Sequence, residues 1–135
     1  MYKHLLIPVI LDGLHDGQSS FLAAKALASD GARFTILHVI EDIPGYVSNQ
    51  IPAEVLASAR AQTEKELRTL AKGLPGAKPE LVHGHAGRTI VDFADENNVD
   101  CIVIASHLPG LQNYFIGSTA DRVVRHAKCS VHVIR

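Results

Sequence analysis

The chain has 135 residues, of which 47% are hydrophobic and 20% charged, so it suits one domain with an ordinary apolar core rather than a disordered chain. Its 13 basic and 14 acidic side chains leave a formal net charge of -1, and we expect no nucleic-acid surface. No stretch approaches the roughly 20 apolar residues that cross a bilayer, so we expect a cytoplasmic protein without membrane insertion.

Short apolar runs rich in β-branched residues predict the strands of a sheet. They cover, in chain order, residues 4–9, 33–40, 80–84, 101–105 and 130–134. Segments with helical spacing lie between them, at residues 20–29, after the turn at Gly87 and at residues 119–127.

The longest helix is predicted to begin near Pro52 and to end near Gly73, because proline suits a first helical turn and glycine a left-handed stop. Its apolar stripe is expected to cover the sheet. The stripe consists of Leu56, Ala59, Thr63, Leu67 and Leu70. The stretch from Pro44 to Ile51 is expected to be a loop.

The alternation of strands and helices indicates right-handed crossovers, and therefore a parallel sheet with helices on both faces. The fold class is thus predicted to be α/β, doubly wound, with one domain over residues 1–135. Ligands of such folds bind at the carboxyl ends of the strands, where the crossovers switch direction. The loops 10–19 and 106–118 should face that crevice.

The second of these loops ends in Gly117-Ser118-Thr119 and opens directly into a helix. Free backbone N–H groups, the helix dipole and two hydroxyl groups would all favour a phosphate there. Ser118 and Asp121 also have the spacing of a capping box, and local evidence alone favours that alternative because such boxes are common. A P-loop and a dinucleotide-binding glycine pattern are both absent from the sequence.

Several ordered segments together resemble the universal stress protein family across essentially the whole chain. They are Ile7-Pro8-Val9, Leu37-His38-Val39-Ile40, Ile104-Ala105-Ser106-His107, Gly117-Ser118, residues 123–127 and Ser130-Val131. The resemblance implies a five-stranded parallel sheet in the order 3-2-1-4-5, similar to that of the adenine nucleotide alpha hydrolases. It also implies a homodimer, formed through the edge strand 130–134, and ATP or AMP at the crevice.

The resemblance also assigns residues to parts of a nucleotide site. Pro8, Val9 and Val39 would line the base pocket, residues 105–107 (Ala105, Ser106 and His107) the ribose side, and residues 117–119 the phosphates. Asp12 could reach the pocket in place of the acidic residue that members often carry at the position of Ile10.

The glycine pattern of nucleotide-binding members is incomplete in this chain. Ala105 and Leu108 stand where those members have glycine, and the loop before Gly117 is one residue shorter. This form is similar to a branch with S-H-x-P and a trimmed loop, in which Gly110 would supply part of the lost backbone freedom. Gly117 and Ser118 alone match the pattern directly.

Other residues favour no further chemistry. Cys101 and Cys129 have no metal or redox spacing and are interpreted as small hydrophobic residues. His83 and His85 alternate toward one face of a strand end, but no carboxylate or cysteine completes a metal site. Arg125 is expected to pair with Asp121 four residues earlier.

We therefore predict a non-catalytic adenine-nucleotide-binding regulatory homodimer of the stress response. Two alternatives stay open. One is a nucleotide-free dimeric scaffold. The other is a slow nucleotide hydrolase or phosphotransferase with magnesium, which would need a carboxylate such as Asp12 or Asp16 near the phosphates.

Overall fold

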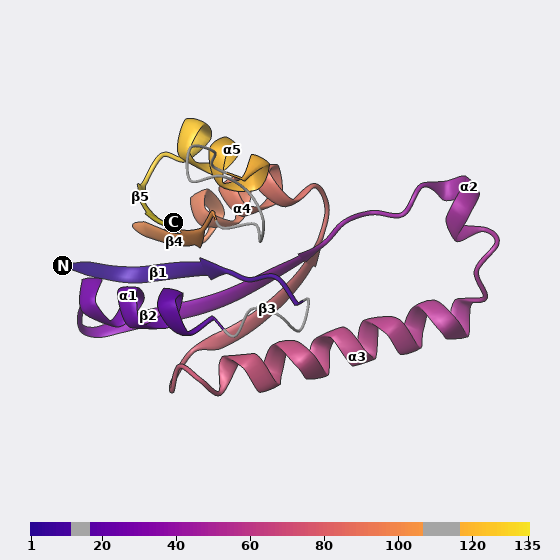
Figure 1. Ribbon diagram of the computed structural model, residues 1–135, viewed down its shortest axis with the longest axis horizontal. Coiled ribbons are helices and arrows are strands. Elements are labelled where there is room, and N and C mark those ends of the chain that lie inside the picture. The colour runs from indigo at the N-terminus through magenta and orange to yellow at the C-terminus, as the bar shows by residue number, and fades with distance from the viewer. Residues whose placement is uncertain (12–16, 107–116) are drawn as a thin grey trace.

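A single five-stranded sheet organises the computed structural model, which describes residues 1–11, 17–106 and 117–135 (Figure 1). The strands are β1 (Tyr2–Pro8), β2 (Ala28–Ile40), β3 (Lys78–His83), β4 (Cys101–Ala105) and β5 (Ser130–Ile134). All neighbours pair in parallel, in the order β3-β2-β1-β4-β5. The predicted fold class and strand order are confirmed.

Helices cover both faces of this sheet. They are α1 (Gln18–Leu27), α2 (Gly45–Ser48), α3 (Ala53–Ala71), α4 (Ala86–Glu96) and α5 (Ser118–His126). Figure 1 shows α1 and α3 on one side of the sheet and α4 and α5 on the other. Within the described residues, no helix combines the length and apolar character needed to cross a membrane.

The central strand β1 supplies side chains to two separate cores. Leu5 and Ile7 pack against Phe21 of α1 and Leu67 of α3, whereas Leu6 packs on the opposite face in the core of α4 and α5. Successive residues of a strand point to opposite faces, so a run that is apolar throughout is buried on both sides. Each such fully buried side chain contributes about 1.5–3 kcal/mol relative to exposure.

The longest helix departs from its prediction in its first half. Leu67 and Ala71 are buried, but Leu56 and Thr63 are only half-buried and Ala59 is exposed. A helix of 19 residues is about 28 Å long, whereas the six residues of β3 span about 20 Å. The predicted stripe therefore covers the sheet only toward its C-terminal end.

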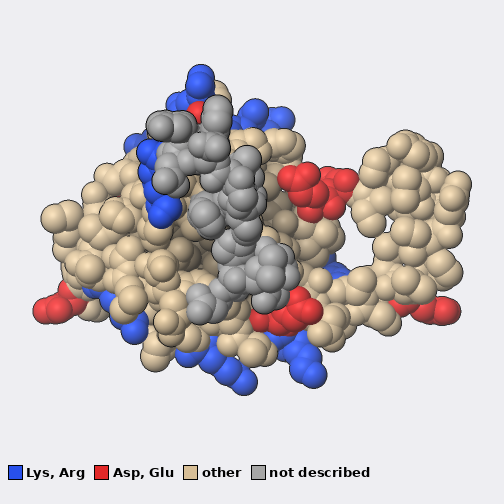
Figure 2. All heavy atoms as spheres, in the orientation of Figure 1, with Lys and Arg blue, Asp and Glu red and all other residues tan. Residues whose placement is uncertain are grey.

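The remainder of α3 projects from the body together with α2 (Figure 1). The prediction of a plain loop over Pro44 to Ile51 is wrong, because α2 forms one helical turn there. Tyr46 and Val47 are exposed in this segment, and Figure 2 shows few charged atoms on its visible face. Its helical turn follows Pro44, whose fixed backbone suits the position before a helix.

Candidate functional site

A cavity of about 390 Å³ opens where the strands of the sheet end. Its floor is apolar and comes from the ends of β1, β2 and β4. The residues are Pro8, Val9, Ile10, Leu37, Val39, Ile104 and Ala105. Because β1 is central and its neighbours belong to crossovers of opposite direction, this is the switch point where doubly wound folds bind ligands.

The first turns of α1, α4 and α5 line the same cavity, α4 through Ala86. Gly17 and residues 18–20 contribute from the start of α1, and Thr119 contributes from the start of α5. The N-cap residues of α1 and α5 are Gly17 and Gly117, neither of which has a side chain to cap the first N–H groups. Two positive dipole ends with backbone donors therefore meet an apolar floor, an arrangement suited to an anionic ligand with an apolar part.

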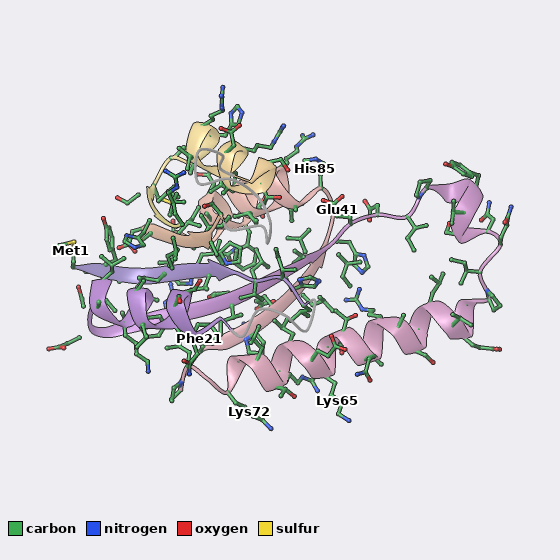
Figure 3. The ribbon with its side chains drawn as sticks, in the orientation of Figure 1. Met1, Phe21, Glu41, Lys65, Lys72 and His85 are labelled. Carbon is green, nitrogen blue, oxygen red and sulfur yellow. The ribbon has the colours of Figure 1, made fainter. Side chains whose placement is uncertain are left out.

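The start of α4 differs from these two. Its N-cap residue, His85, makes no side-chain cap, but Glu41 after β2 accepts a hydrogen bond from the Ala86 N–H at 3.2 Å. Figure 3 shows Glu41 and His85 close together at this end of the sheet. A carboxylate of the protein itself thus takes the place of an external anion at α4.

The capping-box interpretation of Ser118 is wrong. Gly117 is the N-cap residue, so Ser118 lies inside the first turn of α5. Asp121 does not complete a capping box, because its carboxylate accepts hydrogen bonds from Arg125 Nε at 3.1 Å. The predicted pair between Asp121 and Arg125 is confirmed, and the hydroxyl of Ser118 is not used as an N-cap.

Apart from Ser106, the predicted site residues divide into three groups. Pro8, Val9, Val39, Ala105 and Thr119 line the cavity. Gly117 caps α5, and Ser118 faces a second, open depression of about 540 Å³ shared with Thr119. Asp12, His107 and Gly110 lie outside the described residues.

Ser106 is described but does not line the cavity. Its N–H donates to the carbonyl oxygen of Ile134 at 2.8 Å, and its Oγ donates to the same oxygen at 3.3 Å. Only 6% of the residue is exposed. Ser106 therefore ties the end of β4 to β5, and a ribose contact through its hydroxyl stays a prediction.

The predicted site residues did not include Gly17, His38 or Arg135, which also line the cavity, although Gly17 belongs to the loop 10–19 that was expected to face it. The left-handed conformation of Gly17, with φ of 74°, places the start of α1 against the cavity. A glycine directly before a helical pattern was the available signal. His38 and Arg135 carried no signal, because their positions depend on how β2 and β5 end beside β1 and β4.

The second depression carries charges that are largely balanced within the protein. Glu41 and Asp121 lie in it with Arg122 and Arg125. Arg122 packs over Gly87 so closely that a Cβ there would lie 2.7 Å from its Cδ. His85 also lines this depression, whereas His83 contacts the guanidinium of Arg60 on α3, so the two histidines are engaged in different surroundings.

These features define a doubly wound α/β protein with a ligand-sized cavity at its switch point. The sequence profile of the universal stress protein family matches residues 1–135. The chain therefore belongs to the universal stress protein family.

Individual relatives agree with this assignment over their full lengths. The "Universal stress protein in QAH/OAS sulfhydrylase 3'region" of Thermus aquaticus is 30% identical over 140 residues, covering 100% of both chains. The solved structure of UspA from Lactobacillus plantarum is 29% identical with a TM-score of 0.69, covering 99% of this chain and 98% of that one.

A structure with a ligand has the same fold. The universal stress protein from Archaeoglobus fulgidus in complex with dAMP has a TM-score of 0.67, covering 99% of this chain and 98% of that one. Its sequence is 20% identical.

Proposed function

We propose that this protein binds an adenine nucleotide, ATP or AMP, in the cavity at the carboxyl ends of β1, β2 and β4, and acts as a binding module rather than an enzyme. The observation that carries the proposal is the meeting of an apolar floor with two glycine-capped helix N-termini in one cavity. A relative of the same fold was solved with dAMP, which supports an adenine nucleotide.

The two parts of the cavity suit the two parts of a nucleotide. The side chains of Pro8, Val9 and Val39 offer an apolar surface for a base. The N-terminus of α5 offers backbone N–H groups and the hydroxyls of Ser118 and Thr119 for phosphate oxygens. A volume of about 390 Å³ lies within the usual range of small-molecule pockets, about 300–1,000 Å³.

We propose no magnesium ligand on the part of the cavity wall that the structure describes. Among the described residues that line the cavity there is no carboxylate side chain, and carboxylate oxygens are the usual protein ligands of Mg²⁺. Magnesium would then reach the site only with the phosphates of ATP. A hydrolase would depend on Asp12 or Asp16, which lie outside the described residues.

We also propose that two copies pair through β5, as a regulatory homodimer in the cytoplasm that serves the stress response. β5 is an edge strand of the sheet, and unpaired backbone groups at an edge favour pairing with another chain. Ser130 and His132 are exposed on it, and Val131 and Val133 are half-buried. Cys101 and Cys129 are free thiols, which fits a reducing compartment.

The proposal is tested by denaturing the purified protein, analysing released nucleotides, and measuring the melting shift with added AMP and ATP, with and without magnesium. A nucleotide at 100 times its Kd should add about 2.7 kcal/mol of stability. Ala105→Trp should block the cavity and abolish the shift, whereas Ala57→Trp, on the exposed part of α3, should retain it. No released nucleotide and no shift at millimolar AMP and ATP would favour the nucleotide-free scaffold.

A further inference from the structure

The segment that projects from the body gathers exposed apolar side chains. The arm, defined here as residues 43–55, comprises α2 and the start of α3. It holds four of the eight exposed large hydrophobic side chains among the described residues, namely Ile43, Tyr46, Val47 and Val55. No residue of α2 is buried, and 76% of Tyr46 is exposed. Exposed apolar side chains clustered in this way mark an interaction surface.

Acidic residues lie at both ends of the arm. Residues 43–53 include no charged side chain, whereas Asp42 precedes them and Glu54 follows. Both side chains are exposed, and among the described residues neither carboxylate forms a hydrogen bond or an ion pair. Figure 2 shows acidic side chains on either side of the uncharged arm. The complementary surface is therefore apolar, with free basic groups beside it.

The outer face of α1 has this complementary composition. Leu22, Lys25 and Ala26 are all exposed, at the i, i+3 and i+4 spacing of a single helix face. The apolar side chain of Leu22 is 64% exposed. We call these three residues, together with Lys72, the α1 patch.

Lys72 belongs to this patch although it lies at the end of α3. A Cβ on the next residue, Gly73, would lie 3.1 Å from Cε2 of Phe21 on α1, so this end of α3 packs against α1. Figure 3 shows Lys72 pointing away from the body of the molecule. Among the described residues, the ammonium groups of Lys25 and Lys72 form no hydrogen bond or ion pair. The α1 patch thus offers two free cations beside an apolar side chain.

The two surfaces cannot serve each other within one molecule. The arm and α1 lie at opposite ends of the structure (Figure 1). A second copy of the chain supplies the complement of each surface, and a reciprocal contact about a twofold axis uses both pairs at once and closes the assembly.

We propose that the arm docks on the α1 patch of a second copy of this chain, and that the reciprocal contact forms about a twofold axis. Apolar side chains meet at the centre, and the free carboxylates and ammonium groups pair around them and fix the orientation. This contact is separate from the pairing of β5. The arm is smaller than the roughly 20–30 residues a side of a standard interface, so the contact forms at hundreds of micromolar protein rather than at micromolar concentration.

The first test joins neighbouring carboxylates and amines with a zero-length carbodiimide reagent at high protein concentration. Covalent dimers are isolated on a denaturing gel, and their cross-linked peptides are identified by mass spectrometry. We expect links from Asp42 or Glu54 to Lys25 or Lys72. Covalent dimers without any of these links would overturn the proposal, and so would the absence of covalent dimers.

The second test reverses the charges and measures sedimentation velocity at the same concentration. The double variant Asp42→Lys/Glu54→Lys should lower the average mass, and so should Lys25→Glu/Lys72→Glu, because each brings like charges together. All four changes in one chain should restore the wild-type mass. The control is Glu96→Lys, exposed at the end of α4 on the other side of the sheet, which should leave the mass unchanged.

Tyr46→Ser tests the apolar centre. It should lower the average mass and leave the far-ultraviolet circular dichroism unchanged, because the side chain is mostly exposed within one copy.

A four-fold variant that stays dissociated would overturn the proposal, as would double variants that keep the wild-type mass. A wild type whose mass does not rise between micromolar and hundreds of micromolar protein would do the same. None of these results bears on nucleotide binding or on β5, because the variants leave the cavity and the edge strand intact. The cross-linking result on the wild type decides the matter even if a variant does not fold.

Discussion

Oε1 of Glu41 lies 3.2 Å from the backbone nitrogen of Ala86, so a carboxylate at the end of β2 caps the first turn of α4. The residues are 45 positions apart in the chain. This bond joins two of the segments that surround the site. The starts of α1 and α5, which also line the cavity, have glycine N-caps instead of such a carboxylate.

Glu41→Ala should lower the free energy of unfolding by about 0.5–2 kcal/mol, the usual cost of losing an N-terminal cap. Glu41→Gln keeps an acceptor and should cost less, because only the charge facing the helix dipole is lost. Urea denaturation measures both, with Asp42→Ala, at an exposed neighbour, as the control. Equal stability of Glu41→Ala and Asp42→Ala would contradict the assigned cap.

Gly17→Ala should destabilise the protein more than Gly31→Ala. Both glycines have φ near 75°, so both substitutions carry the left-handed penalty of about 1–2 kcal/mol. At Gly17 a Cβ would also lie 2.9 Å from Cζ of Phe21, whereas Gly31 has nothing within 4 Å. Thermal unfolding gives the comparison.

The same pair separates stability from binding. Gly17 lines the cavity, and Gly31 lies in β2 far along the strand from its carboxyl end. Gly17→Ala should therefore also weaken nucleotide binding at a temperature where both variants are folded. Unchanged affinity would show that the start of α1 does not contact the ligand.

Stability should fall as the pH drops below about 6.5, the usual pKa of histidine, because of His4. Burial lowers the pKa of His4, and the positive charge of Arg33 lowers it further. The hydrogen bond to the Asn97 carbonyl and the charge of Asp100 act in the opposite direction. In the neutral ring Nδ1 donates to the Asn97 carbonyl oxygen at 3.1 Å, which leaves Nε2 to accept from the Thr35 hydroxyl at 2.8 Å. The unfolded chain thus binds the proton first, so the stabilisation is present above pH 6.5 and lost as the pH falls through the lowered pKa.

The measurement is the melting temperature from pH 7.5 to pH 5. His4→Gln, which cannot titrate, should show a shallower decline, and His126→Gln, at an exposed position of α5, should match the wild type. Parallel curves for all three proteins would refute this role. Asp100 contributes a further loss of stability only at lower pH. Burial raises the pKa of its carboxyl group, but hydrogen bonds from the N–H groups of Lys3 and His4 hold that pKa below its usual 3.8.

Neither cysteine should react rapidly with a thiol reagent in the native protein at pH 8. Burial raises the pKa of the Cys101 thiol to about 11, and the residue is only 1% exposed. Burial also raises the pKa of the half-buried Cys129. Thiolate is the reactive form, so labelling should be slow at both, slowest at Cys101, and complete after unfolding in urea. Fast native labelling of Cys101 would contradict its packing.

His132→Glu should weaken the proposed dimer, because it places like charges near each other where two copies of β5 pair. Light scattering after size exclusion should show a higher proportion of monomer than in the wild type. His126→Glu, on an exposed position of α5, serves as the control. A wild type that is monomeric at micromolar concentration would remove the basis of this prediction.

Local pattern determined the fold and the general position of the site. The β-branched runs 101–105 and 130–134 coincide with β4 and β5. Strict alternation with helices implied the parallel sheet and its switch point, because crossover handedness leaves few topologies. Buried apolar residues at fixed periods carry that information within a few neighbouring positions.

Tertiary structure decided which polar groups surround the cavity. Gly117 rather than Ser118 caps α5, Glu41 caps α4 from another element, and His38 donates to Val9 across two strands. The contacts of Glu41 and His38 depend on how the carboxyl ends of neighbouring strands align. Hydrogen bonds between residues distant in sequence form only after register is set, so local propensity carries no signal for them.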